Sequence, residues 1–138
     1  METTCFGSVM FMVVLGHLLG DYLFQSKNVA IGKAGNKKVC AYHCTIYTFC
    51  VCLCTWNFSP LFATLIFLSH YPMDYFSFGA KWLKFIKGRD FMEEFESTDK
   101  YRDIALPFST LIYAVVDNSW HLVAMTAVVL ILSHFGLF

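Results

Sequence analysis

Four long apolar runs limit what this chain can fold into more than any other feature of its sequence. They span about residues 7–26, 39–57, 61–82 and 106–136. Each is at least as long as the stretch of about 17–20 residues that a helix needs to cross the hydrocarbon of a membrane. Because backbone groups in lipid must be hydrogen-bonded within the chain, such runs form helices. The sequence therefore predicts an all-α fold, a four-helix transmembrane bundle made by a single integral membrane domain over residues 1–138.

The composition agrees with a protein surrounded largely by lipid. Hydrophobic residues make up 57% of the chain and charged residues only 14%, whereas about a quarter of a soluble protein is charged. The formal net charge is zero, which predicts no nucleic-acid partner. The six cysteines show no paired C-x-x-C spacing, so we expect them to pack as small free thiols. The opening METTCFGSVM lacks the basic region of a secretory signal, and the first run is expected to remain as a span.

The positive charges predict the direction of the helices. All ten lysines and arginines lie in two connections, at Lys27, Lys33, Lys37, Lys38, Lys81, Lys84, Lys87, Arg89, Lys100 and Arg102. Because basic connections stay on the cytoplasmic side of a membrane, both connections are predicted to be cytoplasmic and both termini outside. This predicts a multi-pass protein of the inner (cytoplasmic) membrane, in contact with membrane lipid.

Histidines and aspartates interrupt the apolar runs in a regular pattern. Three pairs have a spacing of four residues: His17 with Asp21, His70 with Asp74, and Asp117 with His121. That spacing puts both side chains of a pair on one helix face, and ionisable residues inside membrane helices are costly and usually functional. In the predicted topology, each carboxylate lies one turn nearer the cytoplasm than its histidine. We call these six residues and His43, near the start of the second run, the His/Asp centre.

The chemistry of this centre favours a divalent transition metal. Imidazole and carboxylate together suit zinc, manganese or iron better than magnesium or calcium. All seven residues of the His/Asp centre are candidate ligands, which exceeds the needs of one tetrahedral zinc. Seven ligands suit two ions about 3.5–4 Å apart that share a bridging carboxylate and activate a water molecule. Asp21, Asp74 and Asp117 are the candidate catalytic residues, because one of them would bridge the ions or orient that water.

The sequence supports three hypotheses for function. The first is a metal-dependent hydrolase that acts on a phosphoester, including a lipid-linked one, at the cytoplasmic face. Lys33, Lys37 and Lys38 in the first connection could then contact phosphate oxygens, although signalling topology is a sufficient role for them. The second is a metal-ion or proton translocator that uses the same polar residues. The third is a non-enzymatic membrane partner protein, in which histidine–aspartate hydrogen bonds only lock the bundle.

A proline lies inside one of the polar pairs. Pro72 stands between His70 and Asp74 in SHYPMDY, and a proline inside a helix removes one backbone hydrogen bond and clashes with the preceding turn. We therefore predict that the third helix bends or breaks at Pro72 and opens space beside the pair. A packing kink without access is the alternative.

The motifs HLLGDYLFQS, AYHCTIYT, SHYPMDY and VDNSWHL resemble those of a family of small prokaryotic and phage membrane proteins, the domain of unknown function 3307 family. The resemblance covers nearly the whole chain, and the first and third motifs carry most of it. It implies binding roles for the amides of Gln25, which follows Asp21, and Asn118, where the family often has glutamine. Tyr47 stands where the family commonly has a histidine. The family is distantly similar to membrane-bound metal-dependent hydrolases with intramembrane His-x-x-x-Asp motifs, which implies hydrolysis without naming a substrate.

Overall fold

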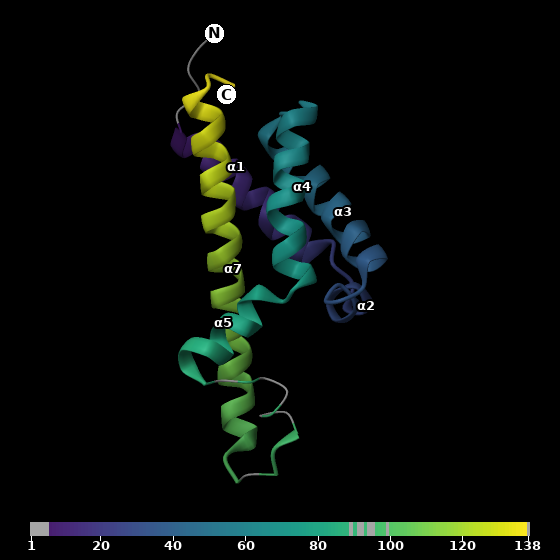
Figure 1. Cartoon of the computed structure of the whole chain (residues 1–138), viewed down its shortest axis with the longest axis vertical. Coiled ribbons are helices and arrows are strands. Elements are labelled where there is room, and N and C mark those ends of the chain that lie inside the picture. Colours follow the sequence, from purple (N-terminus) through teal and green to yellow (C-terminus); the bar gives the residue numbers. More distant parts are fainter. Residues whose placement is uncertain (1–5, 89, 91–92, 94–95, 99, 138) are drawn as a thin grey trace.

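The protein is built from helices. The computed structural model describes residues 6–88, 90, 93, 96–98 and 100–137, and no strand occurs among them. The elements are α1 (Phe6–Leu18), the π-helix η1 (Leu19–Leu23), α2 (Lys27–Gly32), α3 (Lys37–Thr55), α4 (Pro60–Tyr75), α5 (Phe78–Lys87) and α7 (Arg102–His134) (Figure 1). The prediction of an all-α fold is confirmed.

Three helical segments are long and apolar enough to cross a membrane. They are Phe6–Leu23, Lys37–Thr55 and Arg102–His134. The 16 residues of α4 rise only about 24 Å, which is less than the roughly 30 Å of hydrocarbon in a bilayer. These segments indicate a membrane protein, while the fourth crossing stays a prediction.

The segment expected to form the third span is divided between two helices. α4 continues through Pro72 to Tyr75, so a break at Pro72 itself is wrong. The chain leaves the helix at Ser77, whose φ of 49° lies in the left-handed region, and α5 begins at the next residue. The Ser77 amide donates to the Asp74 carbonyl at 3.1 Å. The break therefore lies just after Asp74, and residues 61–82 do not form one continuous helix.

Four helices enclose a common interior. α1 contacts both α3 and α7, and α4 contacts the same two helices. In Figure 1 the start of α1 and the end of α7 lie at one end of this group, while α2, α5 and the beginning of α7 lie toward the other. Among the described residues, those of the two basic connections therefore share an end of the molecule, opposite the start of α1 and the end of α7.

Two glycines, one in α1 and one in η1, bring these elements close to α3. A Cβ atom on Gly16 would lie 2.6 Å from the Cα of Val51, and one on Gly20 would lie 2.9 Å from the ring of Tyr47. Small residues four apart allow membrane helices to approach at backbone distance. The neighbours of these glycines, His17 and Asp21, are thereby carried into the interior.

The interior near the termini is apolar. Its buried residues are Val9, Val13, Tyr47, Val51, Cys52, Phe62, Ile66, Met125, Val128, Val129 and Leu132. The cysteines from Cys40 to Cys54 are free, as predicted, and Cys5 lies outside the described residues.

Candidate metal centre

Four histidines meet inside the bundle, one from each enclosing helix. His17 of α1, His43 of α3, His70 of α4 and His121 of α7 are each no more than 2% exposed. The ring of His70 stacks on that of His121 with centroids 4.2 Å apart, and it lies 5.2 Å from that of His43. The convergence predicted from the four-residue spacing is therefore present in the structure.

Asp74 lies at the middle of the cluster. Its Oδ2 is 3.1 Å from the Nε2 atoms of both His43 and His70. Its other oxygen, Oδ1, is 3.4 Å from Nε2 of His121 and 2.9 Å from Nζ of Lys33. The two oxygens of one carboxylate thus face two different groups of side chains.

Asp21 approaches the same histidines from the opposite helix. Its Oδ1 lies 3.1 Å from Nε2 of His43 and 3.4 Å from Nε2 of His70, and its Oδ2 lies 3.5 Å from Nδ1 of His17. Asp21 belongs to the π-helix η1, where the Phe24 amide bonds to the Leu19 carbonyl five residues earlier. Such single-turn π-helices are frequent at functional sites.

Asp117 is the outermost carboxylate. Its Oδ2 lies 3.7 Å from Nε2 of His121, and its side chain is 17% exposed, compared with 1% for Asp74. Asp117 therefore borders both the buried cluster and the space outside it.

The cluster contains three overlapping groups that could hold a metal ion. They are His17, Asp21 and His70; His43, His70 and Asp74; and Asp74, Asp117 and His121. In the second group the two Nε2 atoms are 3.2 Å apart, close to the spacing of about 3.3 Å between the ligands of a tetrahedral zinc. Asp74 belongs to two groups, as a bridging carboxylate would.

Several buried atoms of these groups make no hydrogen bond of standard geometry, even where a histidine nitrogen lies 3.1 Å from a carboxylate oxygen. They include Nδ1 of His17, Oδ1 of Asp21, Oδ2 of Asp74 and Nε2 of His121. Leaving buried polar atoms without hydrogen bonds is costly. Here these atoms belong to the groups of nitrogens and oxygens that could each surround one ion. Their mixture of imidazole and carboxylate fits a divalent transition metal.

Asn118 fixes the tautomer of His17. The Asn118 amide nitrogen donates to the Ala114 carbonyl at 2.6 Å and to the Tyr22 hydroxyl, so the amide oxygen must face the histidine. That oxygen lies 2.8 Å from Nε2 of His17 and accepts its proton. The Nδ1 atom of His17 is then unprotonated and turned toward Asp21, as a metal ligand requires.

Lys33, the residue that follows α2, reaches the carboxylates. Burial lowers the pKa of Lys33, but the carboxylates of Asp74 and Asp21 outweigh burial and hold the pKa above its ordinary value. The amine is therefore charged. With its amide oxygen toward Lys33, Gln25 accepts from Nζ at 3.1 Å and donates to the Asp21 carbonyl at 3.3 Å.

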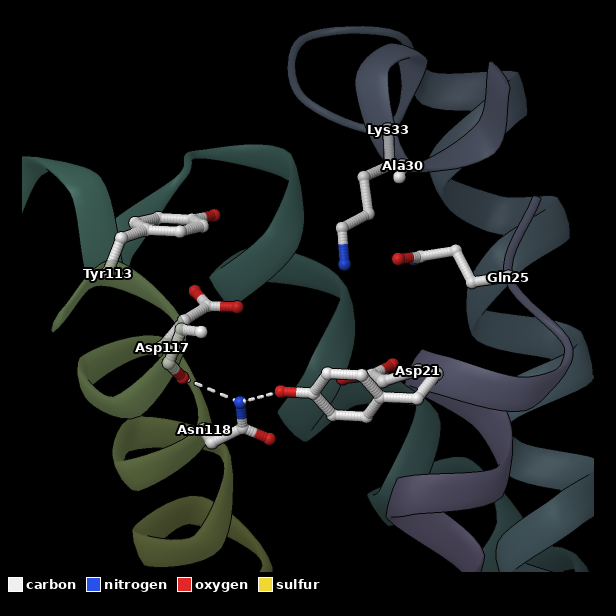
Figure 2. Close-up of a pocket in the computed structure, with 9 residues that line it drawn as sticks. Asp21, Gln25, Ala30, Lys33, Tyr113, Asp117 and Asn118 are labelled. Carbon is white, nitrogen blue, oxygen red and sulfur yellow. Dashed lines mark hydrogen bonds between the residues drawn. The ribbon is translucent and has the colours of Figure 1, made fainter. Parts of the chain in front are cut away.

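A small cavity adjoins the carboxylates. It has a volume of about 170 Å³ and is lined by Asp21, Tyr22, Gln25, Ala30, Lys33, Tyr113, Ala114, Asp117 and Asn118. Figure 2 shows Lys33 pointing into the space between Gln25 and Asp117. The cavity is therefore bounded by η1, α2 and α7, beside two of the carboxylates.

The structure separates the residues predicted to bind substrate. Gln25, Lys33 and Asn118 line the cavity, whereas Lys37 is exposed at the first position of α3 and lies away from it. The side chain of Asn36 caps α3 by accepting from the Lys38 and Val39 amides. This cap sets the start of the helix and leaves Lys37 on its outer surface.

No role at the site was predicted from the sequence for Tyr22, Tyr47 or Tyr113, and Tyr22 lines the cavity and accepts from the Asn118 amide. Tyr47 stacks on His70 with ring centroids 3.6 Å apart, and its hydroxyl contacts the sulfur of Met125. Tyr113 lines the cavity. Tyr47 follows His43 by four residues and Tyr113 precedes Asp117 by four, so the spacing that revealed the polar pairs also places these rings on the same helix faces.

Residues 9–137 match one protein family, described as a protein of unknown function (DUF3307). No curated protein and no solved structure matches the chain.

Proposed function

The chain belongs to the DUF3307 family, whose description assigns no activity, and from the site itself we propose that the protein is an integral-membrane, metal-dependent hydrolase of a phosphoester. The observation that carries this proposal is the position of Asp74, whose two oxygens face separate groups of candidate ligands. A carboxylate between two cation positions is typical of centres that act on phosphoryl groups, where metal ions and basic side chains together clamp the phosphoryl oxygens. Zinc, manganese and iron are the metals that the donor set favours.

The roles of the side chains follow from their positions. His43, His70 and Asp74 would hold an ion, with Asp21 or His17 completing its ligands. When bound, such an ion polarises a phosphoryl oxygen and makes water a better nucleophile. Lys33 and Gln25 would hold phosphate oxygens in the cavity. Asp117, at the edge of the cavity, would orient the attacking water and accept its proton.

The cavity lies at the end of the bundle that carries the basic connections. By the positive-inside rule this end faces the cytoplasm, and we place the protein in the inner membrane with its termini outside. A phosphorylated head group would enter the cavity from that side, and a lipid-linked substrate would keep its apolar part in the bilayer. Cysteine labelling that placed residues 27–38 outside the cell would contradict this orientation.

Two observations argue against the two other hypotheses, namely the apolar interior near the termini and the geometry of the buried carboxylates. A metal-ion or proton translocator needs a polar path to both sides of the membrane, but between the four histidines and the termini the described interior is filled by side chains such as Val13, Val51 and Val129. A purely structural lock would satisfy its buried polar atoms with each other. Oδ1 of Asp21 and Oδ2 of Asp74 make no hydrogen bond of standard geometry, although histidine nitrogens lie 3.1 Å away, and this favours a ligand role instead.

The decisive experiment is metal analysis of the protein purified in detergent, with stoichiometry, alongside hydrolysis of phosphomonoesters and phosphodiesters. We expect bound transition metal and an activity that a chelator removes. Asp74→Asn should remove most of the metal while the protein still inserts, because asparagine keeps hydrogen bonding but is a much poorer ligand. A protein that binds none of zinc, manganese or iron would contradict the proposal.

A further inference from the structure

One of the three candidate ligand groups already faces a positive charge. It is formed by Asp74, Asp117 and His121, and the ammonium of Lys33 lies 2.9 Å from Oδ1 of Asp74. The same oxygen lies 3.4 Å from Nε2 of His121. The ammonium therefore contacts the oxygen that a second metal ion would use.

The chain holds Lys33 in this position from both sides. The Lys33 amide donates to the Val29 carbonyl at the end of α2, and Ser26 caps the start of that helix. Two residues further on, the Gly35 amide donates to the Tyr75 carbonyl at 3.1 Å, which ties the α2–α3 connection to the end of α4. The Lys33 side chain is only 12% exposed, so its direction is set by the fold.

The charges of the cluster balance with one divalent ion. Asp21, Asp74 and Asp117 supply three negative charges at side chains that are at most 17% exposed. Lys33 supplies one positive charge, which leaves two negative charges when the histidines are neutral ligands. Uncompensated charge is costly inside a membrane protein. A single divalent ion cancels it, whereas two such ions beside Lys33 would leave an excess of two positive charges.

We propose that the Lys33 ammonium occupies the second cation position of the centre, so that the protein binds one divalent ion, at His43, His70 and Asp74, in place of two. This inference rests on the proposed metal centre. It also specifies the substrate position, because a phosphate group bridging the ion and Lys33 would lie at the cavity beside Asp117 and Gln25. An ammonium binds phosphate as a point charge, and it leaves activation of water to the single ion.

The test is metal stoichiometry after saturation with zinc or manganese and removal of loosely bound ions. We expect one ion per chain in the unmodified protein and two in Lys33→Met, which frees the group of Asp74, Asp117 and His121 and keeps the length of the side chain. Lys27→Met is the matched control, since Lys27 is exposed on the same helix, and it should still bind one ion. Lys33→Arg, which keeps the positive charge, should also bind one.

Each outcome distinguishes this inference from the proposed function. Two ions in the unmodified protein would overturn the role of Lys33 and leave a metal-dependent hydrolase standing. One ion in both the unmodified protein and Lys33→Met would likewise overturn the role of Lys33 without affecting the proposed hydrolase. No ion in the unmodified protein would overturn both. If Lys33→Met fails to fold, Lys33→Gln replaces it, and the stoichiometry of the unmodified protein remains decisive.

Discussion

The two halves of the bundle interior use the same helices and opposite chemistry. Along α1 and η1, steps of four residues lead from buried Val13 to His17 and then to Asp21. In α4, the same steps lead from Ile66, which is fully buried, to His70. Each helix thus continues one inward face from an apolar layer near the termini to a polar layer near the basic connections. Within one helix face, residues in the apolar layer stabilise the bundle, whereas residues in the polar layer form the candidate site. The role of a residue therefore depends on its position along the helix and not on which helix it belongs to.

The two layers also differ in what they need from outside the chain. The apolar layer is complete, because side chains such as Val51 and Val129 fill it with no exposed surface. The polar layer retains buried atoms that make no hydrogen bond of standard geometry, including Oδ1 of Asp21 and Oδ2 of Asp74. A ligand is therefore expected to stabilise the polar layer alone, and changes in the two layers should have separable effects.

Among changes outside the candidate ligands, the largest expected effect belongs to Asn118, which orients His17. Asn118→Leu removes the acceptor for Nε2 of His17, so the proton is free to move to Nδ1 and block the ligand atom. Loss of such an orienting partner weakens metal affinity by about 10–100-fold. The measurement is competitive zinc titration in detergent.

The control for Asn118 is its neighbour. Ser119→Leu introduces the same side chain at an exposed position whose hydroxyl bonds only within α7, to the Val115 carbonyl. We expect its zinc affinity to match that of the unmodified protein. Equal affinities in Asn118→Leu and Ser119→Leu would show that the amide does not orient His17.

A change in the apolar layer should have a smaller effect of another kind. Ile66→Val removes one methylene group from a fully buried side chain, which typically destabilises a protein by about 0.5–1.5 kcal/mol. Thermal unfolding in detergent should show this loss, while metal affinity stays unchanged because Ile66 lies one turn away from His70. A parallel fall in metal affinity would mean that the two layers are coupled.

The sequence was sufficient for the parts of the site that depend on helix periodicity. His70 and Asp74 share a face because they are four residues apart, and that face had to turn inward because lipid excludes charge. The same argument predicted that His17 and Asp21 would meet them. An all-helical chain with long apolar segments followed from the length of the runs.

Tertiary contacts determined what the sequence could not predict. Asn118 was implied as a binding residue, but its bond to His17 joins residues that are far apart in the chain. The break after α4 depends on the left-handed backbone conformation of Ser77, whereas the sequence predicted a bend or break at Pro72. No periodicity could reveal that the short α2 would return Lys33 to Asp74.

Substitution of Lys37 has the smallest predicted effect and tests the contrast between Lys33 and the other lysines of the first basic connection. From the sequence, Lys33 and Lys37 were equivalent candidates for phosphate binding, because both lie in one basic connection four residues apart. The structure places a turn and the Asn36 cap between them, so Lys33 points into the cavity while Lys37 is exposed. Lys37→Ala should therefore change the free energy of unfolding by less than about 0.5 kcal/mol, as surface substitutions usually do. Metal stoichiometry and the KM for a phosphoester should remain at the values of the unmodified protein. A raised KM in Lys37→Ala would mean that the substrate extends beyond the cavity onto the start of α3.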